Sequence, residues 1–326
     1  VFYYERVLAD TFTIDVAQRL MDLYTEKDRY DDAMSVAAAI LANDPVNNHA
    51  RRSLGFALYK RGELTESLDA FYVALRIDPA DTYSAFYVAR IYLEQGEYDR
   101  SLQEIRRAIG VNPDFIELWI YLGFAAIEKR DYALAEYAFT EAAYRGGDRA
   151  QLYYLLGAVM ETRGMDTDAY FYYRKALKTD PFDQAALESL ANLASRIGRD
   201  SETFDTFRRI LDIDTLNAVA LNYVGYTFAE RNDSLEYALE LINRAIDIDV
   251  DNGYYIDSRG WVYYQMGRYE DALAELKRAA GLVEDPVILE HLGDVYMKLN
   301  ERDAALTAYE RAAELDSGNK ALRAKI

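Results

Sequence analysis

The chain has 326 residues, of which 51% are hydrophobic, 13% aromatic and 29% charged, so its composition is that of a folded protein and excludes a disordered or collagen-like polymer. Its formal net charge of -19 repels the phosphate backbone over most of the surface and disfavours a nucleic-acid partner. The absence of cysteine excludes a disulfide framework and thiolate metal sites, and it is compatible with cytosol and periplasm alike.

The longest uncharged apolar run, from Leu118 to Ile127, covers about ten residues and is well short of the roughly 18 that span a bilayer. The sequence therefore predicts no transmembrane segment. It starts with Val1 and shows no basic and apolar leader, so we expect any export signal or lipid attachment site to lie outside these residues.

Small residues recur at intervals of about 34 residues, a period typical of repeat arrays. The first column of small positions reads Met21, Gly55, Ala89, Gly123, Gly157, Ala191, Gly225, Gly260 and Gly293. The second reads Ala33, Ser67, Ser101, Ala135, Ala169, Thr203, Ala238, Ala272 and Ala305. Small side chains at fixed spacing allow two helices to approach closely, and the apolar residues between them follow helical spacing. Each repeat is therefore predicted to be a pair of helices.

Along the chain, residues 1–13 are predicted to be a remnant of a preceding repeat, because FYYERVLADT resembles FYYRKALKTD at 171–180. Residues 14–317 form nine repeats, and residues 318–326 are expected to begin a helix that caps the array. The turns inside the repeats fall on Asp28, Gly62, Gly96, Arg130, Gly164, Gly198, Asn232, Gly267 and Asn300, mostly residues that tolerate a left-handed backbone. The second helices end near Asp44-Pro45, Asp78-Pro79, Asn112-Pro113 and Asp180-Pro181, because proline cannot continue a helix.

These columns, with the proline near the end of the repeat, resemble the tetratricopeptide repeat (TPR) over residues 14–317. The resemblance implies an all-α fold, an α-solenoid that forms a right-handed superhelix of about nine helix-turn-helix units. One residue is inserted before Ala238, and we expect it to change the pitch locally.

Motifs for other chemistry are absent or incomplete. DIDVDNG at 247–253 has the alternating aspartates of a calcium loop, but Asn252 and Ser258 replace its required Gly and Glu. The two histidines, His49 and His291, lie in different repeats, so they form neither a zinc cluster nor a catalytic triad. Gly146-Gly147 lacks the lysine of a phosphate loop. We therefore predict no metal, no cofactor and no enzymatic activity.

The resemblance implies that the first helices line a concave groove suited to peptides. The residues expected to face it are Arg52, Phe56, Tyr59, Lys60, Tyr83, Phe86, Arg90, Phe124, Tyr154, Asn192, Asn222, Tyr226, Tyr254, Trp261 and Tyr264. Aromatic rings supply large contact areas for a protein partner. The alternative is that many of the 29 tyrosines serve only to pack the repeats.

The predicted groove is divided in charge. Arg52, Lys60 and Arg90 are expected to receive an acidic group or a C-terminal carboxylate, and Asn192 and Asn222 to hold a ligand backbone. The rest of the groove is expected to favour apolar or basic segments, because its acids are Glu117, Glu128, Glu161, Glu188, Glu230, Asp257, Glu290 and Asp294.

The C-terminal third resembles bacterial envelope TPR lipoproteins that act as adaptors for carboxy-terminal processing proteases. The likeness rests on LNYVGYTFAER at 221–231, YIDSRGWVYYQMGRYEDAL at 255–273 and EHLGDVYMKLNERDAAL at 290–306. It implies a periplasmic or outer-membrane-anchored protein, with a cytoplasmic location still open.

The predicted function is a non-enzymatic scaffold or adaptor that binds a protein or peptide, such as a protease or an envelope assembly component. The alternatives are a scaffold that self-associates through its ends and an accessory region of a larger enzyme.

Overall fold

The computed structural model describes residues 1–10 and 12–326, except for the side chains of residues 7–10. The described residues form helices joined by turns and contain no strand. The chain divides into two compact units, Val1–Ala169 and Tyr170–Ile326. Residue 11, which belongs to the predicted N-terminal remnant, lies outside the described residues.

The helices of the first unit are α1 (Phe2–Asp10), α2 (Ile14–Glu26), α3 (Tyr30–Asn43), α4 (Asn48–Lys60), α5 (Leu64–Ile77), α6 (Thr82–Glu94), α7 (Tyr98–Val111), α8 (Ile116–Glu128), α9 (Tyr132–Tyr144) and α10 (Arg149–Thr162). Helix α11 (Asp166–Thr179) contains the division between the units. The second unit continues with α12 (Gln184–Arg196), α13 (Asp200–Ile213), α14 (Ala218–Glu230), α15 (Leu235–Ile248), α16 (Gly253–Gln265), α17 (Tyr269–Leu282), α18 (Pro286–Lys298), α19 (Arg302–Leu315) and α20 (Lys320–Arg323).

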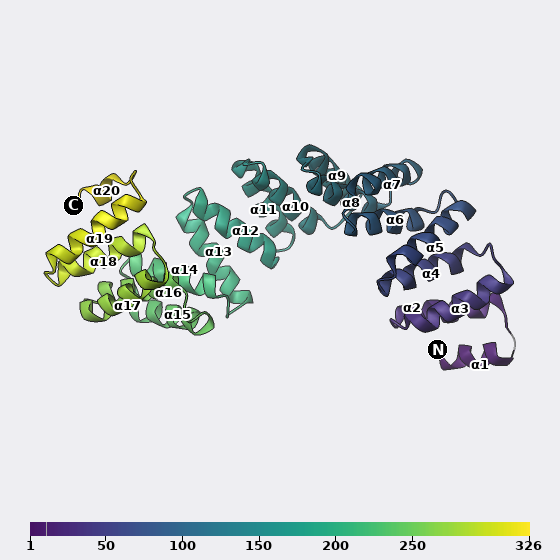
Figure 1. Ribbon diagram of the computed structural model, residues 1–326, viewed down its shortest axis with the longest axis horizontal. Coiled ribbons are helices and arrows are strands. Elements are labelled where there is room, and N and C mark those ends of the chain that lie inside the picture. Colours follow the sequence, from purple (N-terminus) through teal and green to yellow (C-terminus); the bar gives the residue numbers. More distant parts are fainter. Residues whose placement is uncertain (11) are drawn as a thin grey trace. The chain divides into compact units, whose positions relative to one another are not determined.

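The helices pack as hairpins that follow one another in chain order within each unit (Figure 1). Helix α4 packs on α5 and α6 on α7 in the first unit, and α14 packs on α15 and α16 on α17 in the second. Within each unit, neighbouring hairpins also contact each other, for example through α5 and α6 in the first unit and α15 and α16 in the second. The described chain is therefore the α-solenoid that the repeat predicts.

The turns inside the hairpins confirm the predicted positions. The backbone angle φ is positive at Asp28, Gly62, Gly96, Arg130, Gly164, Gly198, Asn232, Gly267 and Asn300. A left-handed residue at this place ends the first helix and reverses the chain into the second. The second helices end as predicted too: α3, α5, α7 and α11 each stop two residues before a proline.

The columns of small residues let the two helices of a hairpin come into contact. At Gly123 on α8, a Cβ atom would lie 2.3 Å from a ring carbon of the buried Phe139 on α9. The second column adds hydrogen bonds that size alone does not predict: the Ser67 hydroxyl donates to the Gly55 carbonyl at 2.7 Å, and the Ser101 hydroxyl donates to the Ala89 carbonyl at 2.8 Å. The small columns thus let the two helices of a hairpin approach each other, and the serines of the second column join them by hydrogen bonds.

The inserted residue before Ala238 lies in the turn between α14 and α15. Two residues of this turn, Asn232 and Ser234, have left-handed backbones, with φ of 49° and 48°. The other hairpin turns have one such residue. The extra residue is therefore taken up within the turn, and Ala238 keeps its buried place.

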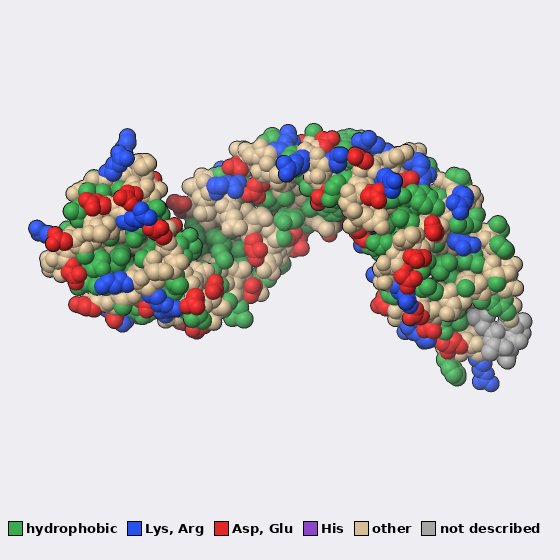
Figure 2. Space-filling view, in the orientation of Figure 1, with side chains coloured by type: hydrophobic (Ala, Val, Ile, Leu, Met, Phe, Trp, Pro, Cys, Tyr) green, Lys and Arg blue, Asp and Glu red, His purple; other side chains and the backbone are tan. Residues whose placement is uncertain are grey.

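The first helices of successive hairpins contact one another: α2 contacts α4, α4 contacts α6 and α6 contacts α8, while in the second unit α14 contacts α16 and α16 contacts α18. We call the surface of α2, α4, α6 and α8 the first-helix face of the first unit, and that of α14, α16 and α18 the first-helix face of the second unit. On the side of the molecule seen in Figure 2, acidic and basic side chains are interspersed over both units. Neither sign of charge therefore dominates the side of either unit that Figure 2 shows.

Candidate functional site

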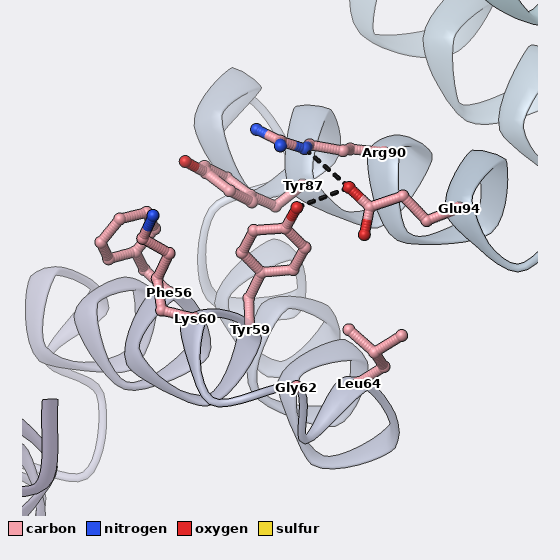
Figure 3. Close-up of a pocket in the computed structure, with 8 residues that line it drawn as sticks. All are labelled: Phe56, Tyr59, Lys60, Gly62, Leu64, Tyr87, Arg90 and Glu94. Carbon is pink, nitrogen blue, oxygen red and sulfur yellow. Dashed lines mark hydrogen bonds and ion pairs between the residues drawn. The ribbon is translucent and has the colours of Figure 1, made fainter. Parts of the chain in front are cut away.

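Two cavities lie side by side on the first-helix face of the first unit. One has a volume of about 400 Å³ and is lined by Phe56, Tyr59, Lys60, Gly62, Leu64, Tyr87, Arg90 and Glu94 (Figure 3). The other has a volume of about 410 Å³ and is lined by Asp22, Thr25, Glu26, His49, Arg52, Ser53, Phe56 and Tyr83. Phe56 lines both cavities. Each cavity is large enough for a few side chains of a bound segment.

Tyr87 on α6 is the centre of the aromatic part of this site. Its ring lies 5.5 Å from the ring of Phe56 and 5.4 Å from that of Tyr59, both edge to face, and 4.8 Å from that of Tyr83. It also stacks on Phe71 of α5 at 5.2 Å, which fixes it to the core. Aromatic pairs at these distances hold their rings in defined orientations, so the cavity walls are preformed.

Tyr87 was absent from the predicted groove residues. If each repeat is numbered so that the first column of small residues holds the eighth place, Tyr87 holds the sixth place, whereas the predicted groove residues hold the second, fifth, ninth, twelfth and thirteenth places. Its signal in the sequence is the spacing of Tyr83, Tyr87, Arg90 and Glu94, which places them along one side of a helix.

Arg52 is already paired within the protein. Its guanidinium lies 3.5 Å from the carboxylate of Asp81, whose side chain is only 2% exposed. Asp81 caps α6 by accepting from the Ser84 amide at 3.3 Å, and it also accepts from the amide group of Asn48 at 3.2 Å. The cationic head of Arg52 also lies 5.7 Å from the centre of the Tyr83 ring. Arg52 thus helps to hold α4 against the start of α6, while its side chain stays 36% exposed.

Arg90 is also paired, with Glu94 one turn later on α6 at 3.0 Å. Tyr59 donates its hydroxyl to the same carboxylate, so Glu94 joins α4 to α6, as the dashed lines in Figure 3 show. Burial and this hydrogen bond raise the pKa of Tyr59, which keeps the hydroxyl protonated as a donor.

Lys60 differs from the two arginines. No carboxylate of the described residues lies within ion-pair distance of its ammonium group, which instead lies 5.8 Å from the centre of the Phe56 ring (Figure 3). Of the three predicted cations, the structure therefore leaves Lys60 with the fewest internal contacts, and its exposed side chain lines the first cavity.

The other predicted residues of the first unit occupy different surroundings. Phe86 is buried and packs on Tyr121 at 5.0 Å, which leaves little of its ring for a partner. Phe124 lines a smaller cavity of about 220 Å³ with Leu93, Tyr98, Ile127 and Glu128. Tyr154 lies half-buried on α10.

In the second unit the predicted aromatic residues gather around Trp261 on α16. Tyr264 stacks on Trp261 with ring centres 4.7 Å apart, and the ring nitrogen of Trp261 donates to Glu230 of α14 at 2.5 Å. Tyr226 lies half-buried on α14, where burial and the carboxylates of Glu230, Asp257 and Glu290 raise its pKa. By contrast, Asn192 and Tyr254 are exposed, and Asn222 is half-buried with its side-chain oxygen enclosed.

A buried histidine completes this cluster. His291 on α18 is 7% exposed, stacks on Trp261 at 4.1 Å and lies 2.9 Å from a carboxylate oxygen of Asp257. Burial disfavours its charged form, but the hydrogen bond to Asp257 and the carboxylates of Asp294 and Glu230 outweigh that effect and raise the pKa of His291. Like Tyr87, His291 holds the sixth place of its repeat and was missed as a site residue. The sixth place is thus central in both clusters.

The described residues contain no group of three or more His, Asp or Glu side chains arranged to hold a metal ion. Nor does the described part of the chain have a helix of the length and apolar character needed to cross a membrane.

Comparisons with known proteins identify relatives across much of the repeat array. A TPR repeat-containing protein of Pseudomonas aeruginosa is 28% identical over 218 residues, which cover 64% of this chain and 35% of that protein. Anaphase-promoting complex subunit 7 of Mus musculus is 21% identical over 268 residues, which cover 82% of this chain and 47% of that subunit. The chain spans less than half the length of these two relatives.

Among solved structures, a tetratricopeptide repeat protein from Parabacteroides merdae aligns with a TM-score of 0.51 at 17% identity, over 87% of this chain and 98% of that one. This likeness supports the fold. A family model described as tetratricopeptide repeat matches residues 20–82, 89–159 and 258–321, more than half of the chain. The chain belongs to the tetratricopeptide repeat family.

Proposed function

We propose that the protein is a non-enzymatic scaffold that binds a segment of a partner protein along the first-helix face of the first unit. The observation that carries this proposal is the pair of cavities that share Phe56 in their linings. Their walls come from successive first helices, so an extended segment that crosses the helices would place neighbouring side chains in the two cavities.

The lining indicates the chemistry of that segment. The rings of Phe56, Tyr59 and Tyr87 offer an apolar surface to an aromatic or branched side chain. Lys60 is an exposed residue of the same lining and would receive a carboxylate from the segment or from its C terminus. Arg52 and Arg90 would donate further hydrogen bonds to this carboxylate while keeping their contacts with Asp81 and Glu94.

Selection from a library of random peptides with free C termini tests this proposal and does not require that the natural partner be identified first. We expect the wild-type chain to enrich peptides that combine an acidic group with an aromatic or branched residue. Phe56→Ala should abolish the enrichment, and Lys60→Gln should remove the acidic preference alone. Arg76→Gln, which removes a cation from the exposed side of α5, is the matched control. Selection of the same peptides by Phe56→Ala would exclude the two cavities as the binding site.

The finer version of this function is an adaptor for a protease or for an assembly component of the bacterial envelope. It is supported by the likeness of segments 221–231, 255–273 and 290–306 to envelope TPR lipoproteins and by the similarity to a bacterial TPR protein. As such an adaptor, the chain should raise the cleavage rate of a substrate protein by a purified carboxy-terminal processing protease. An unchanged rate would count against this version and leave the general scaffold role untouched.

Two alternatives have their own tests. A self-assembling scaffold would increase in mass with concentration in light scattering, whereas a monomeric adaptor would not. An accessory region of a larger enzyme is compatible with the chain spanning less than half of its relatives, and the full reading frame would reveal the catalytic region.

A further inference from the structure

Lys325 places its ammonium group in a cluster of acidic and aromatic side chains on the second unit. The nitrogen lies 2.7 Å from Glu290 and 2.7 and 2.8 Å from the two carboxylate oxygens of Asp294. It also lies 5.5 Å from the centre of the Tyr309 ring. Three carboxylate oxygens and the face of an aromatic ring together match the hydrogen-bonding and charge needs of an alkylammonium group.

The side chains that contact Lys325 are held by regular helices. Glu290 and Asp294 lie one turn apart on α18, and their side chains are 24% and 18% exposed. Tyr309 on α19 donates its hydroxyl to Asp294 at 2.7 Å. Its ring packs so closely on Gly293 that a Cβ atom there would lie 2.3 Å from it. The receptor for the ammonium group is therefore built into the α18–α19 hairpin.

Lys325 lies just after a much shorter helix, α20. This four-residue helix is anchored by the buried Leu322 and by the cap that Asn319 provides. The Lys325 side chain is 34% exposed, so rotation about its own bonds can move the ammonium group away from the carboxylates without unfolding α18 or α19.

Around this receptor, carboxylates outnumber cations. Glu290 and Asp294 are like charges at an i, i+4 spacing, an arrangement that destabilises a helix unless a cation neutralises it. Glu230 and Asp257 lie on the same first-helix face, and no Lys or Arg of the described residues is within ion-pair distance of either. The nearby cations are Lys325, Lys298 over the Tyr264 ring, and His291 when protonated. The face therefore has negative charge left for a ligand that carries more than one positive charge.

We propose that Glu290, Asp294 and Tyr309 form a receptor for a lysine side chain on a basic segment of a partner protein, and that Lys325 occupies it until the partner displaces it. Glu230 and Trp261 extend the same face and would contact further residues of the basic segment. This site is separate from the cavities of the first unit and has the opposite charge preference.

Calorimetric titration of the full chain with a blocked oligolysine peptide tests the proposal. Lys325→Ala should tighten binding about tenfold, because a site closed about nine-tenths of the time loses that factor in apparent affinity. Lys320→Ala removes the same charge from the exposed start of α20 and should change the affinity little. In the Lys325→Ala chain, adding Glu290→Gln and Asp294→Asn should weaken binding at least about tenfold through the loss of charged hydrogen bonds.

The matched control for the acidic pair is Glu236→Gln with Asp247→Asn, which removes two exposed carboxylates from α15. An equal loss of oligolysine affinity from the acidic pair and from its control pair would show that oligolysine responds only to the net charge. Equal effects of Lys325→Ala and Lys320→Ala on the affinity would exclude Lys325 as the internal occupant of the receptor. If the chain with Lys325→Ala, Glu290→Gln and Asp294→Asn loses its helical circular dichroism, the chain with Lys325→Ala and Asp294→Asn is used in its place. The asparagine keeps an oxygen that can accept the hydrogen bond from Tyr309. Phe56→Ala should leave oligolysine binding unchanged, so this proposal and the role of the first unit fail independently.

Discussion

The ring of His291 and the carboxylate of Asp257 lie 2.9 Å apart and join the neighbouring first helices α18 and α16 inside the second unit. Both residues are less than one-tenth exposed, at 7% for His291 and 6% for Asp257. Trp261 covers one face of the histidine ring. The pair therefore links the protonation of one histidine to the stability of the second unit.

This link predicts a dependence of stability on pH. Because the folded-state pKa of His291 is raised above its ordinary value of about 6.5, the native protein holds the proton more tightly than the unfolded chain. The free energy of unfolding should be highest below that value and should fall as the pH rises through the folded-state pKa. Urea unfolding at a series of pH values measures this fall.

The control for this prediction uses a chain with His49→Gln, so that His291 is the remaining histidine. In that background, Asp257→Asn removes the negative partner and should flatten the decline in stability with pH. A decline of the same size in both chains would assign it to other groups.

The close approach of Gly123 to Phe139 predicts a large effect of a single methyl group. Gly123→Ala places a Cβ 2.3 Å from the ring of Phe139, which is fully buried, so a neighbour must shift and the free energy of unfolding should fall by about 1–3 kcal/mol. Gly110→Ala on α7 meets no atom within 4 Å and should instead raise it by about 0.5–1 kcal/mol. Thermal unfolding of the two variants should thus shift in opposite directions, and equal shifts would contradict the packing role of the small column.

The left-handed turns predict changes that depend on the backbone alone. At Gly62, φ is 79° and an added Cβ would meet no atom within 4 Å, so Gly62→Ala should cost about 1 kcal/mol through conformation only. At the equivalent place of another hairpin Arg130 has φ of 58°, and Arg130→Asn should gain about 0.5 kcal/mol, because asparagine tolerates this conformation. Chemical denaturation measures both, and destabilisation by Arg130→Asn would show that the arginine side chain makes a contact that offsets its backbone cost.

Much of the fold could be predicted because its determinants are local and repeated. A left-handed residue at Gly62 or Asn300 and a small residue at Gly123 each satisfy a constraint that recurs in the hairpins. The sequence therefore indicated the turns, the helix ends and the faces that the helices bury.

The pairing of the site residues could not be predicted in the same way. Arg52 binds Asp81 at the end of its own repeat, Tyr59 binds Glu94 in the next repeat, and Lys325 reaches back to Asp294. These contacts depend on side-chain conformations and on how far one helix is displaced against another, which the repeat pattern leaves open. The central roles of Tyr87 and His291 were missed for a related reason, since residues at the sixth place come together only when the first helices pack.

The most direct test of the central claim is photo-crosslinking in cells, with a photoreactive amino acid placed either at Ser53 or at Asp69. Ser53 lies on α4 and lines a cavity of the first unit, whereas Asp69 is exposed on the neighbouring second helix α5. A scaffold that binds its partner along the first-helix face should give a crosslinked product from Ser53 and none from Asp69. A product from Asp69 with none from Ser53 would contradict it.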